Sequence, residues 1–405
     1  MKKKKIGVIG GGAAGFFFAI NVLENRNDIA VDILEKSPKL LEKVRISGGG
    51  RCNVTHACFD PKLLVKNYPR GEKELISPFF QFQPKQLIEW FENKGVQIKT
   101  EADGRMFPNT DDSSTIVDCL YNSAKSAGVN IMTLCGVDEI KHINDIWIVK
   151  TNTGKTLQYD ALFISTGSAA RMWDMLSSLG HSIAPPVPSL FTFKIKDPRL
   201  EDLMGVSVPV AEVSIPILKL KERGAVLITH WGLSGPAILR LSAWGARELA
   251  SVNHQGNIVI NWTGNFTKNK VLEELKTEKI QHPKKLVISS KSFDIPSRLW
   301  VSLCRYAEID ETLIFADVTH KKLDILADAL TQSSFQILGK STNKDEFVTA
   351  GGVSLKEVDM KTMQSKLYKN LFFGGEVLNV DAITGGFNFQ AAWTTSWIAA
   401  TQLNL

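Results

Sequence analysis

The spacing of hydrophobic residues along the chain predicts a parallel β-sheet. Nearly continuous apolar runs stand at Ile6–Ile9, Ala30–Leu34, Ala161–Ile164 and Leu371–Phe373. Strands of this kind are buried on both faces, as in parallel sheets that helices cover. Because the last run needs neighbouring strands that the N-terminal half supplies, we expect the two ends of the chain to share one sheet and one core.

Other segments have the period of helices or of short strands. Helices are predicted over Pro84–Asn93, Thr115–Ala127, Asn269–Gln281, Ser297–Ile309, Lys321–Leu330 and from about Phe387 to Leu403. Strand-like runs at Val129–Leu134, Asp145–Thr151 and Lys155–Tyr159 predict a small β-meander, and Gly104–Pro108 is expected to form a turn. A further helix is expected to follow His230, with Leu233 or Ser234 as its cap, and to run to Ala250.

The length of the chain predicts more than one domain. It has 405 residues, 44% of them hydrophobic, which exceeds the size at which single hydrophobic cores usually split. The proline run Pro185–Pro188 marks a boundary, because the following segment is strand-like and punctuated by proline. We therefore predict an α/β domain of residues 1–188 and 345–405, an inserted β-rich substrate domain of residues 189–264 and 310–344, and a small helical subdomain of residues 265–309. The active site is expected at the interface between the first domain and the insertion.

The first turn of the chain has the pattern of a dinucleotide-binding loop. Gly10, Gly12 and Gly15 form G-x-G-x-x-G, with Ala13 and Ala14 between the last two, and the motif lies between a strand and a helix. The first glycine permits a tight turn, the second lets a pyrophosphate approach the backbone, and the third lets helix and strand pack closely. Glu35 ends the second strand, where a carboxylate can accept hydrogen bonds from ribose hydroxyls. A βαβ unit without a ligand is the alternative.

Three further glycine-rich or small-residue turns suit contact with the same ligand. Ser47, Gly48, Gly49, Gly50, Arg51 and Asn53 give a flexible backbone rich in hydrogen-bond donors, although a plain solvent loop is the alternative. Cys52 is expected to be packed or to face the ligand rather than to be reactive. Ser165-Thr166-Gly167 follows a buried strand. It resembles the Ala-Thr-Gly turn that returns the chain to the cofactor in two-motif flavoproteins. Glu376 follows another strand, and Gly385-Gly386 precedes a helix whose positive end can face a flavin ring.

The charge and the cysteine content argue against several classes of protein. The formal net charge of +6 comes from 48 basic and 42 acidic residues, a balance too weak to favour a nucleic-acid partner. Residues 265–300 are rich in lysine, and we interpret them as a solvated face, with a surface that contacts a polyanion as the alternative. The five cysteines contain no C-x-x-C pair, which disfavours both a disulfide framework and a zinc site and favours the cytoplasm. No stretch of about 18 uninterrupted apolar residues is present to span a membrane.

Six motifs together resemble one family of proteins. Gly10–Gly15, Ile46–Asn53, Gly104–Pro108, His230–Pro236, Thr349–Val353 and Gly374–Gln390 stand in the order found in bacterial FAD-dependent oxidoreductases of the BaiN/YhiN-like family, which includes aminoacetone oxidase-like proteins. The resemblance implies an FAD-binding Rossmann-like domain assembled from both chain ends, an inserted β-barrel-like domain and a nested helical subdomain. Three positions depart from the family pattern: Ser165 and Ser168 stand where alanine and glycine are usual, and His56 stands where asparagine is common.

The resemblance also implies which residues contact FAD. They are Gly10, Gly12, Ala14, Gly15, Glu35, Lys36, Gly49, Arg51, Cys52, Asn53, Val137, Thr166, Gly167, Glu376, Asp381, Gly386, Phe387 and Asn388. We add their neighbours in the same turns, namely Ala13, Ser47, Gly48, Gly50 and Gly375. Val137 is expected beside the adenine, and Thr166-Gly167 near the pyrophosphate.

The function predicted from the sequence is that of an FAD-dependent oxidoreductase acting on a small organic substrate by hydride transfer at flavin N5. His230 is the candidate acid or base, with a packing or capping role as the alternative. Because only one complete dinucleotide fingerprint is present, oxygen or a transiently bound NAD(P)H is expected as the redox partner. A flavin-dependent RNA-modifying enzyme and a non-catalytic flavin protein that binds a partner through its helical insertion are the alternative functions.

Overall fold

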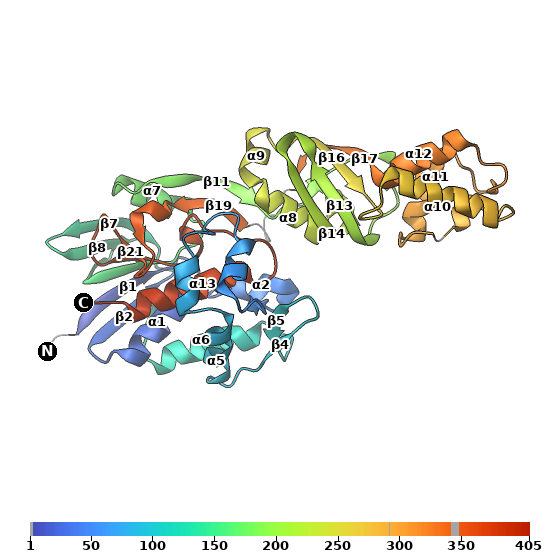
Figure 1. Ribbon diagram of the computed structural model, residues 1–405. Helices are drawn as coiled ribbons and strands as arrows, with labels where there is room; N and C mark the ends of the chain where they lie inside the picture. Colours follow the sequence, from blue (N-terminus) through green and yellow to red (C-terminus); the bar gives the residue numbers. More distant parts are fainter. Residues whose placement is uncertain (1–2, 291, 342–347) are drawn as a thin grey trace. The chain divides into compact units, whose positions relative to one another are not determined.

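The computed structural model describes residues 3–290, 292–341 and 348–405, and the chain forms two compact units (Figure 1). Unit 1 combines Met1–Val187 with Thr349–Leu405, and unit 2 is Pro188–Val348. The first crossing between the units falls in the proline run at 185–188. The predicted return point between residues 344 and 345 lies outside the described residues.

The main sheet of unit 1 contains strands from both ends of the chain. Its strand order is β20-β21-β22-β10-β1-β2-β6, and β22, β10, β1, β2 and β6 are parallel. The strands are β1 (Lys4–Ile9), β2 (Ile29–Leu34), β6 (Asn130–Met132), β10 (Ala161–Ile164), β20 (Val358–Asp359), β21 (Gln364–Ser365) and β22 (Leu371–Phe373). Ile9 pairs with Ile164, and Ile164 pairs with Phe373, so β1, β10 and β22 end at the same edge. The predicted parallel sheet built from both chain ends is confirmed.

Each face of this sheet is covered by a different layer (Figure 1). On one face, Phe16, Phe163 and Trp393 belong to a hydrophobic cluster with the helices, and the rings of Phe18 and Phe163 stack at 4.0 Å. The helices are α1 (Ala13–Asn25), α5 (Pro84–Glu92), α6 (Ser114–Ser126) and α13 (Phe387–Thr401). On the other face, Trp147 and Trp173 pack in a second cluster with a β-meander and α7. These elements are β7 (Val137–Ile143), β8 (Ile146–Thr151), β9 (Thr156–Tyr159) and α7 (Ala170–Ser178).

Two predictions about unit 1 are wrong. The meander begins at β7, whereas the predicted first strand contains β6, which joins the parallel sheet because Asn130 pairs with Asp32 and donates to its carboxylate at 2.9 Å. The segment after Gly104 is a strand, β5 (Arg105–Pro108), which pairs with β3 (Thr55–His56) and β4 (Ile98–Thr100). Further elements are α2 (Glu42–Gly50), α3 (Pro61–Leu64), α4 (Ile76–Gln81), the 3-10 turn η6 (Gly375–Val377) and the pair β11 (Ile183–Ser189) with β19 (Val348–Val353).

Unit 2 is an antiparallel sheet packed with helices. The strand order is β17-β16-β13-β14-β15-β12-β18. The strands are β12 (Phe193–Lys194), β13 (Ser207–Ile215), β14 (Leu220–Thr229), β15 (Gly232–Ser234), β16 (Gly256–Asn261), β17 (Ser333–Ile337) and β18 (Gly339–Lys340). The helices are α8 (Pro236–Trp244), α9 (Ala246–Ser251), α10 (Lys268–Gln281), α11 (Ser297–Tyr306) and α12 (His320–Thr331). Helices α10, α11 and α12 confirm the predicted ones to within a few residues.

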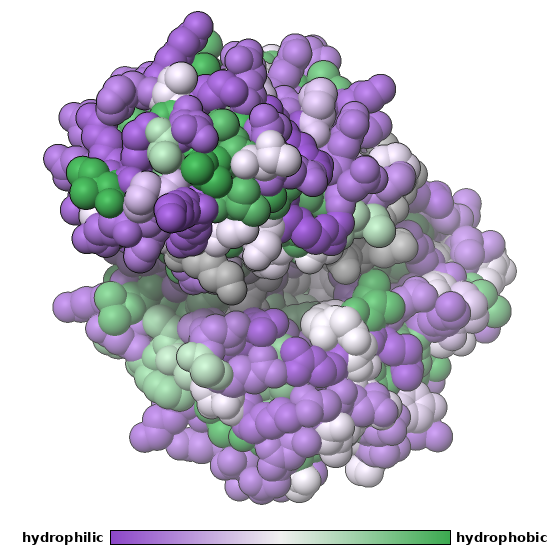
Figure 2. Space-filling model, turned by 90° about the vertical axis from the view of Figure 1, so that its right-hand side faces the viewer, coloured by the Kyte–Doolittle hydropathy of each residue, from purple (hydrophilic) through white to green (hydrophobic). Residues whose placement is uncertain are grey.

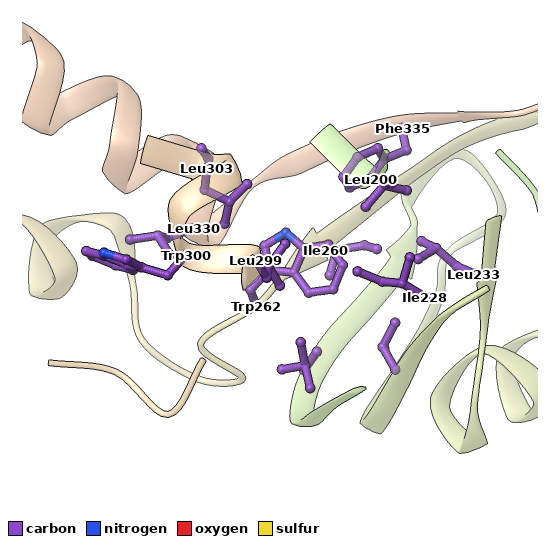
Figure 3. Close-up of a cluster of buried hydrophobic side chains, with 14 of the residues drawn as sticks. Leu200, Ile228, Leu233, Ile260, Trp262, Leu299, Trp300, Leu303, Leu330 and Phe335 are labelled. Atoms are coloured by element: carbon purple, nitrogen blue, oxygen red, sulfur yellow. The ribbon is translucent and has the colours of Figure 1, made fainter. Parts of the chain in front are cut away.

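Sheet and helices of unit 2 share one hydrophobic core. Figure 3 shows Ile260 and Trp262 at the end of β16 close to Leu299 of α11, with Ile228 and Leu233 of the sheet beside them. The predicted cap of α8 is wrong: Leu233 and Ser234 pair with β14 as strand residues, so Gly235 is the cap and Pro236 the first helical residue.

The surface of the protein is mainly polar on the face shown in Figure 2, where hydrophobic residues occur in small groups between hydrophilic ones. Among the described residues, the helices are all too short or too polar to cross a bilayer.

Candidate cofactor site

The turn between β1 and α1 places three glycines in different surroundings. Gly10 has a φ of 109°, and a Cβ there would lie 2.6 Å from the carbonyl oxygen of Ser165. A Cβ on Gly15 would lie 2.1 Å from the carbonyl oxygen of Gly10. Around the Cβ position of Gly12, by contrast, no atom of the described residues lies within 4 Å. Gly10 and Gly15 are therefore required by the packing of the protein, whereas Gly12 faces open space.

The N-terminus of α1 suits an anion. Gly12 is its N-cap and provides no side chain to cap the first turn, and the described first turn contains no acidic residue. The N–H groups of a first helical turn carry partial positive charge and bind phosphate oxygens. Ala13 and Ala14 keep this end of the helix uncrowded because their side chains are single methyl groups.

Glu35 is held at the end of β2 by the backbone. Its Oε2 accepts a hydrogen bond from the Gly11 N–H at 2.8 Å, and its Oε1 accepts one from the Ser37 N–H at 2.8 Å. A carboxylate has further lone pairs, so it can also accept from ribose hydroxyls. The Cβ of Lys36 lies 3.3 Å from the Cβ position of Gly136, and the chain enters β7 there at Val137. The segment after β2 therefore contacts the residue that directly precedes Val137.

The turn after β10 contains a buried hydroxyl without a hydrogen-bond partner among the described residues. Ser165 Oγ lies 3.1 Å from the carbonyl oxygens of both Ile9 and Gly10 and donates to them, which braces the first turn. Thr166 Oγ1 is buried, and within the described residues it forms no hydrogen bond. Because an unpaired buried hydroxyl is costly, this group suits a hydrogen bond to a ligand such as a pyrophosphate. The site therefore fits FAD at this position.

Glu376 lies beside the turn that follows β10 and forms hydrogen bonds with two segments that are distant in the sequence. Lys43 Nζ of α2 donates to Glu376 Oε2 at 2.5 Å, and the Thr349 N–H donates to Glu376 Oε1 at 3.1 Å. The Cβ position of Gly167 lies 3.5 Å from Glu376 Oε2 and 4.0 Å from Lys43 Nζ. Gly375 approaches α1, since its Cβ position lies 3.2 Å from the Cβ of Ala14.

The glycine-rich stretch forms the irregular end of α2. Ser47, Gly48 and Gly49 depart from helical angles, and around the Cβ positions of Gly49 and Gly50 the described residues leave open space. The Arg51 guanidinium lies 4.0 Å from the ring of Phe107 and forms an ion pair with Glu101 at 2.6 Å.

Burial raises the pKa of the Cys52 thiol to about 12. Cys52 follows the irregular end of α2 and is fully buried. Its thiol is therefore protonated at neutral pH, which favours a packing role over a reactive one.

The loop before α13 is fixed by side chains from residues 53–70. The carboxylate of Asp381 is fully buried and paired with the Arg70 guanidinium. The Tyr68 hydroxyl donates to the Phe387 carbonyl oxygen at 2.6 Å, and the side-chain oxygen of Asn53 accepts from the Gly386 N–H at 3.0 Å. Asn388 is bound to the backbone of Ala382 at 2.9 and 3.1 Å. The side chains of Asp381 and Asn388 therefore hold this loop in shape, and Gly386 and Phe387 are placed by their neighbours.

His56 lies against the start of α13. Its ring stacks on Phe387 with centroids 4.6 Å apart, and burial lowers its pKa. Its Nδ1 is a second buried atom for which the described part of the chain offers no hydrogen-bond partner. This nitrogen can donate or accept a hydrogen bond according to the tautomer of the ring, so it suits a polar group of a ligand.

His230, the candidate acid or base, lies in unit 2. It is exposed in the turn between β14 and β15, and its ring centroid lies 4.9 Å from that of exposed Trp231. Because His230 is exposed, the packing role is less favoured than contact with a ligand. The catalytic role of His230 stays a prediction.

Unit 1 thus brings together residues from four distant stretches of the sequence. The sequence did not single out Lys43, Tyr68 or Arg70, and it gave Thr349 only as part of a motif. Their contacts with Glu376, Phe387 and Asp381 bridge these stretches.

Comparison with known proteins identifies one family and several relatives. The profile described as HI0933-like protein Rossmann domain matches residues 4–402. The chain is 28% identical over 98% of its length to the ribosomal RNA dihydrouridine synthase of Escherichia coli K12, of which it covers 97%. It is 24% identical to the 3-dehydro-bile acid delta(4,6)-reductase of Clostridium scindens, with 98% of each chain covered. The solved structure of 3-ketosteroid delta1-dehydrogenase from Sterolibacterium denitrificans has the same fold, with a TM-score of 0.51, 11% identity and 99% of each chain covered.

Proposed function

Because the chain belongs to the HI0933-like Rossmann family, whose members are FAD-dependent oxidoreductases, we propose that it reduces a carbon–carbon double bond conjugated to a carbonyl group in a small organic molecule. FAD is its cofactor, and oxidoreduction is its class of reaction. The bond that it reduces and the electron donor are the parts proposed here. Membership of a family of enzymes also argues against the alternative of a non-catalytic flavin protein.

The observation that carries the proposal is the set of groups around the first turn. These groups are the Gly12 position, the oriented carboxylate of Glu35 and the buried hydroxyl of Thr166, and they lie in one unit on elements fixed by the parallel sheet. The described residues leave open space at Gly12 and form no hydrogen bond with the Thr166 hydroxyl. In our proposal Glu35 accepts from the adenosine ribose, the N-terminus of α1 and Thr166 bind the pyrophosphate, and Lys36 and Val137 flank the adenine. Glu376 is proposed to bind the ribityl chain.

The N-terminus of α13 is proposed to face the N1/O2 edge of the flavin ring. Its loop is held by Asn53, Tyr68 and Arg70, so the helix end is positioned before any ligand arrives. A helix N-terminus carries partial positive charge, which stabilises negative charge on the reduced ring. FAD, when bound, supplies hydride transfer at N5.

The names of two relatives support reduction of a double bond. A delta(4,6)-reductase and a dihydrouridine synthase both have names that describe the addition of hydrogen to an unsaturated ring. Such an addition needs a hydride and a proton. For this chain, His230 is the proposed proton donor, because its exposed imidazole can exchange protons with solvent and transfer one to a bound molecule.

The proposed electron donor is NADH or NADPH that binds transiently. The sequence contains one complete G-x-G-x-x-G unit, which the FAD occupies, so a reduced nicotinamide would bind and leave without a Rossmann domain of its own. Oxygen is the alternative partner and would reoxidise the flavin. We also propose a cytoplasmic location, supported by the free state of Cys52, Cys58, Cys119, Cys135 and Cys304 in the described chain.

Anaerobic half-reactions test the proposal. The purified protein is mixed with NADH or NADPH without oxygen, and bleaching of the flavin absorbance reports reduction. The reduced protein is then mixed with a cyclic enone, with the matching saturated ketone as control. We expect the enone to restore the yellow colour and to be converted to the saturated ketone, whereas a protein that only oxygen reoxidises would refute the proposed reaction.

RNA is the second candidate substrate, because two relatives are named ribosomal RNA dihydrouridine synthase. The uracil ring also contains a double bond conjugated to a carbonyl, so both candidates share one chemistry. Including a uridine-containing RNA and free uridine in the second half-reaction separates them. Reoxidation by RNA and not by small enones would favour the RNA-modifying enzyme.

A further inference from the structure

We infer that Lys43 is a cofactor-binding residue that bridges Glu376 and the pyrophosphate of FAD. The inference rests on FAD binding at the first turn of unit 1 and does not depend on which substrate is reduced. It concerns a residue that lies outside the glycine-rich turns and outside the G-x-G-x-x-G motif.

The position of Lys43 is defined by two contacts. Its Nζ donates to Glu376 Oε2 at 2.5 Å, and it lies 4.0 Å from the Cβ position of Gly167. Gly167 follows Thr166, whose buried hydroxyl forms no hydrogen bond within the described residues. The ammonium group therefore lies beside the turn that is proposed to hold the pyrophosphate.

The charges at this point require a cation. Glu376 Oε2 lies 3.5 Å from the Cβ position of Gly167, so a pyrophosphate at this turn would lie close to a carboxylate. Like charges at such distances repel each other. An ammonium group has three donors, of which one is used on Glu376, so the other two can bind phosphate oxygens. Lys43 would thus attract the pyrophosphate and offset the negative charge of Glu376.

The exposure of Lys43 determines how strong the effect can be. Its side chain is 64% exposed, whereas that of Glu376 is 20% exposed. Solvent and salt screen an exposed charge, so the contribution should be moderate and should fall as ionic strength rises. The same exposure means that a substitution here leaves the core of unit 1 intact.

The test compares ligands that differ in their phosphates. Deflavinated full-length protein is titrated with FAD, ADP and adenosine, for the parent and for Lys43→Met. We expect the dissociation constants of FAD and ADP to rise about tenfold at low salt. The constant for adenosine should not change, and the effect on ADP should shrink at high salt. Lys43→Arg should retain most of the affinity because it keeps the charge.

Lys39→Met is the matched control. Lys39 stands near Lys43 in the sequence, is 73% exposed and pairs with Glu42 at 3.3 Å. Its replacement removes the same charge away from Gly167, so ADP should bind as it does to the parent. Equal melting temperatures of the Lys39→Met and Lys43→Met proteins would show that the fold is unaffected.

A double variant separates binding from a merely structural role. If Lys43 offsets the charge of Glu376, then Lys43→Met with Glu376→Gln should bind ADP more tightly than Lys43→Met alone. ADP is used because it lacks the ribityl chain that Glu376 is proposed to hold. ADP binding by Lys43→Met that equals the control, an equal loss for adenosine, or no recovery in the double variant would each overturn the inference. The enone assay is independent of these titrations, so failure of the proposed reaction would be recognised separately.

Discussion

Replacing Gly386 by alanine tests the proposed position of α13 directly. Gly386 caps the helix with a φ of 92°, a left-handed conformation that costs other residues about 1–2 kcal/mol. A Cβ would lie 2.5 Å from the Thr55 carbonyl oxygen and 2.8 Å from the side-chain amide of Asn53. The helix end must therefore move away from residues 53–55, and the bond between the Gly386 N–H and Asn53 is weakened.

The magnitude follows from the interaction that this movement removes. In our proposal the helix N-terminus stabilises the negative charge of the reduced flavin, and one hydrogen bond to a charged group contributes about 1.5–3 kcal/mol. For a two-electron couple about 1.4 kcal/mol corresponds to about 30 mV. The midpoint potential should thus fall by about 30–65 mV in Gly386→Ala. Spectroscopic redox titration against a reference dye, at equal FAD occupancy of both proteins, measures the shift.

Gly95→Ala is the control for backbone strain. Gly95 has a φ of 81°, and within the described residues its Cβ position has no neighbour within 4 Å. This variant should lose stability through strain but keep the potential of the parent. An unchanged potential in Gly386→Ala would refute the reasoning, because it would mean that this helix end does not act on the flavin.

Four further experiments, three on substitutions and one on chemical modification, have defined expected outcomes. Gly12→Val should yield a folded protein without flavin colour, since the side chain enters the open space where the pyrophosphate is expected; retained FAD would contradict the site. Cys52 should stay unmodified by a thiol reagent at neutral pH until the protein is unfolded, because burial raises its pKa to about 12. Burial lowers the pKa of His181 from 6.5, so the unfolded chain binds a proton more readily than the folded chain does. The free energy of unfolding, measured with urea, should therefore fall as the pH drops below about 6.5. This fall should be smaller in His181→Asn, which lacks the titrating ring. His230→Ala should slow reoxidation by the enone while reduction by NAD(P)H keeps its rate; equal slowing of both would refute a role as proton donor.

The parts of the fold that sequence predicted best are those with a single physical cause. Ala161–Ile164 and Leu371–Phe373 are apolar on both faces because layers cover both faces of the sheet, and both were correctly predicted as buried strands. Strand β6 was misassigned because Asn130–Met132 is too short to reveal which sheet it joins. Its place depends on pairing with Asp32, which the local pattern does not contain.

The candidate site also contains residues that the sequence could predict and others that it could not. The glycines at 10 and 15 could be predicted because a backbone turn requires them wherever the motif occurs. The pairing of Arg70 with Asp381 could not be predicted, because it joins residues 311 positions apart and Arg70 stands in none of the motifs. The role of Asn388 in binding Ala382 likewise depends on the path of the loop.

The pairing of β22 with β10 has a consequence for the order in which the protein is made. A ribosome releases β1, β2 and β10 long before residues 371–373, and Pro188–Val348, which have a hydrophobic core of their own, emerge in between. Glu376 and α13 follow β22 in the chain and leave the ribosome after it. The nascent chain can therefore carry the β1–α1 turn early, whereas the proposed flavin site is complete only after α13 has emerged. FAD capture should accordingly begin only in chains that are long enough to have released α13.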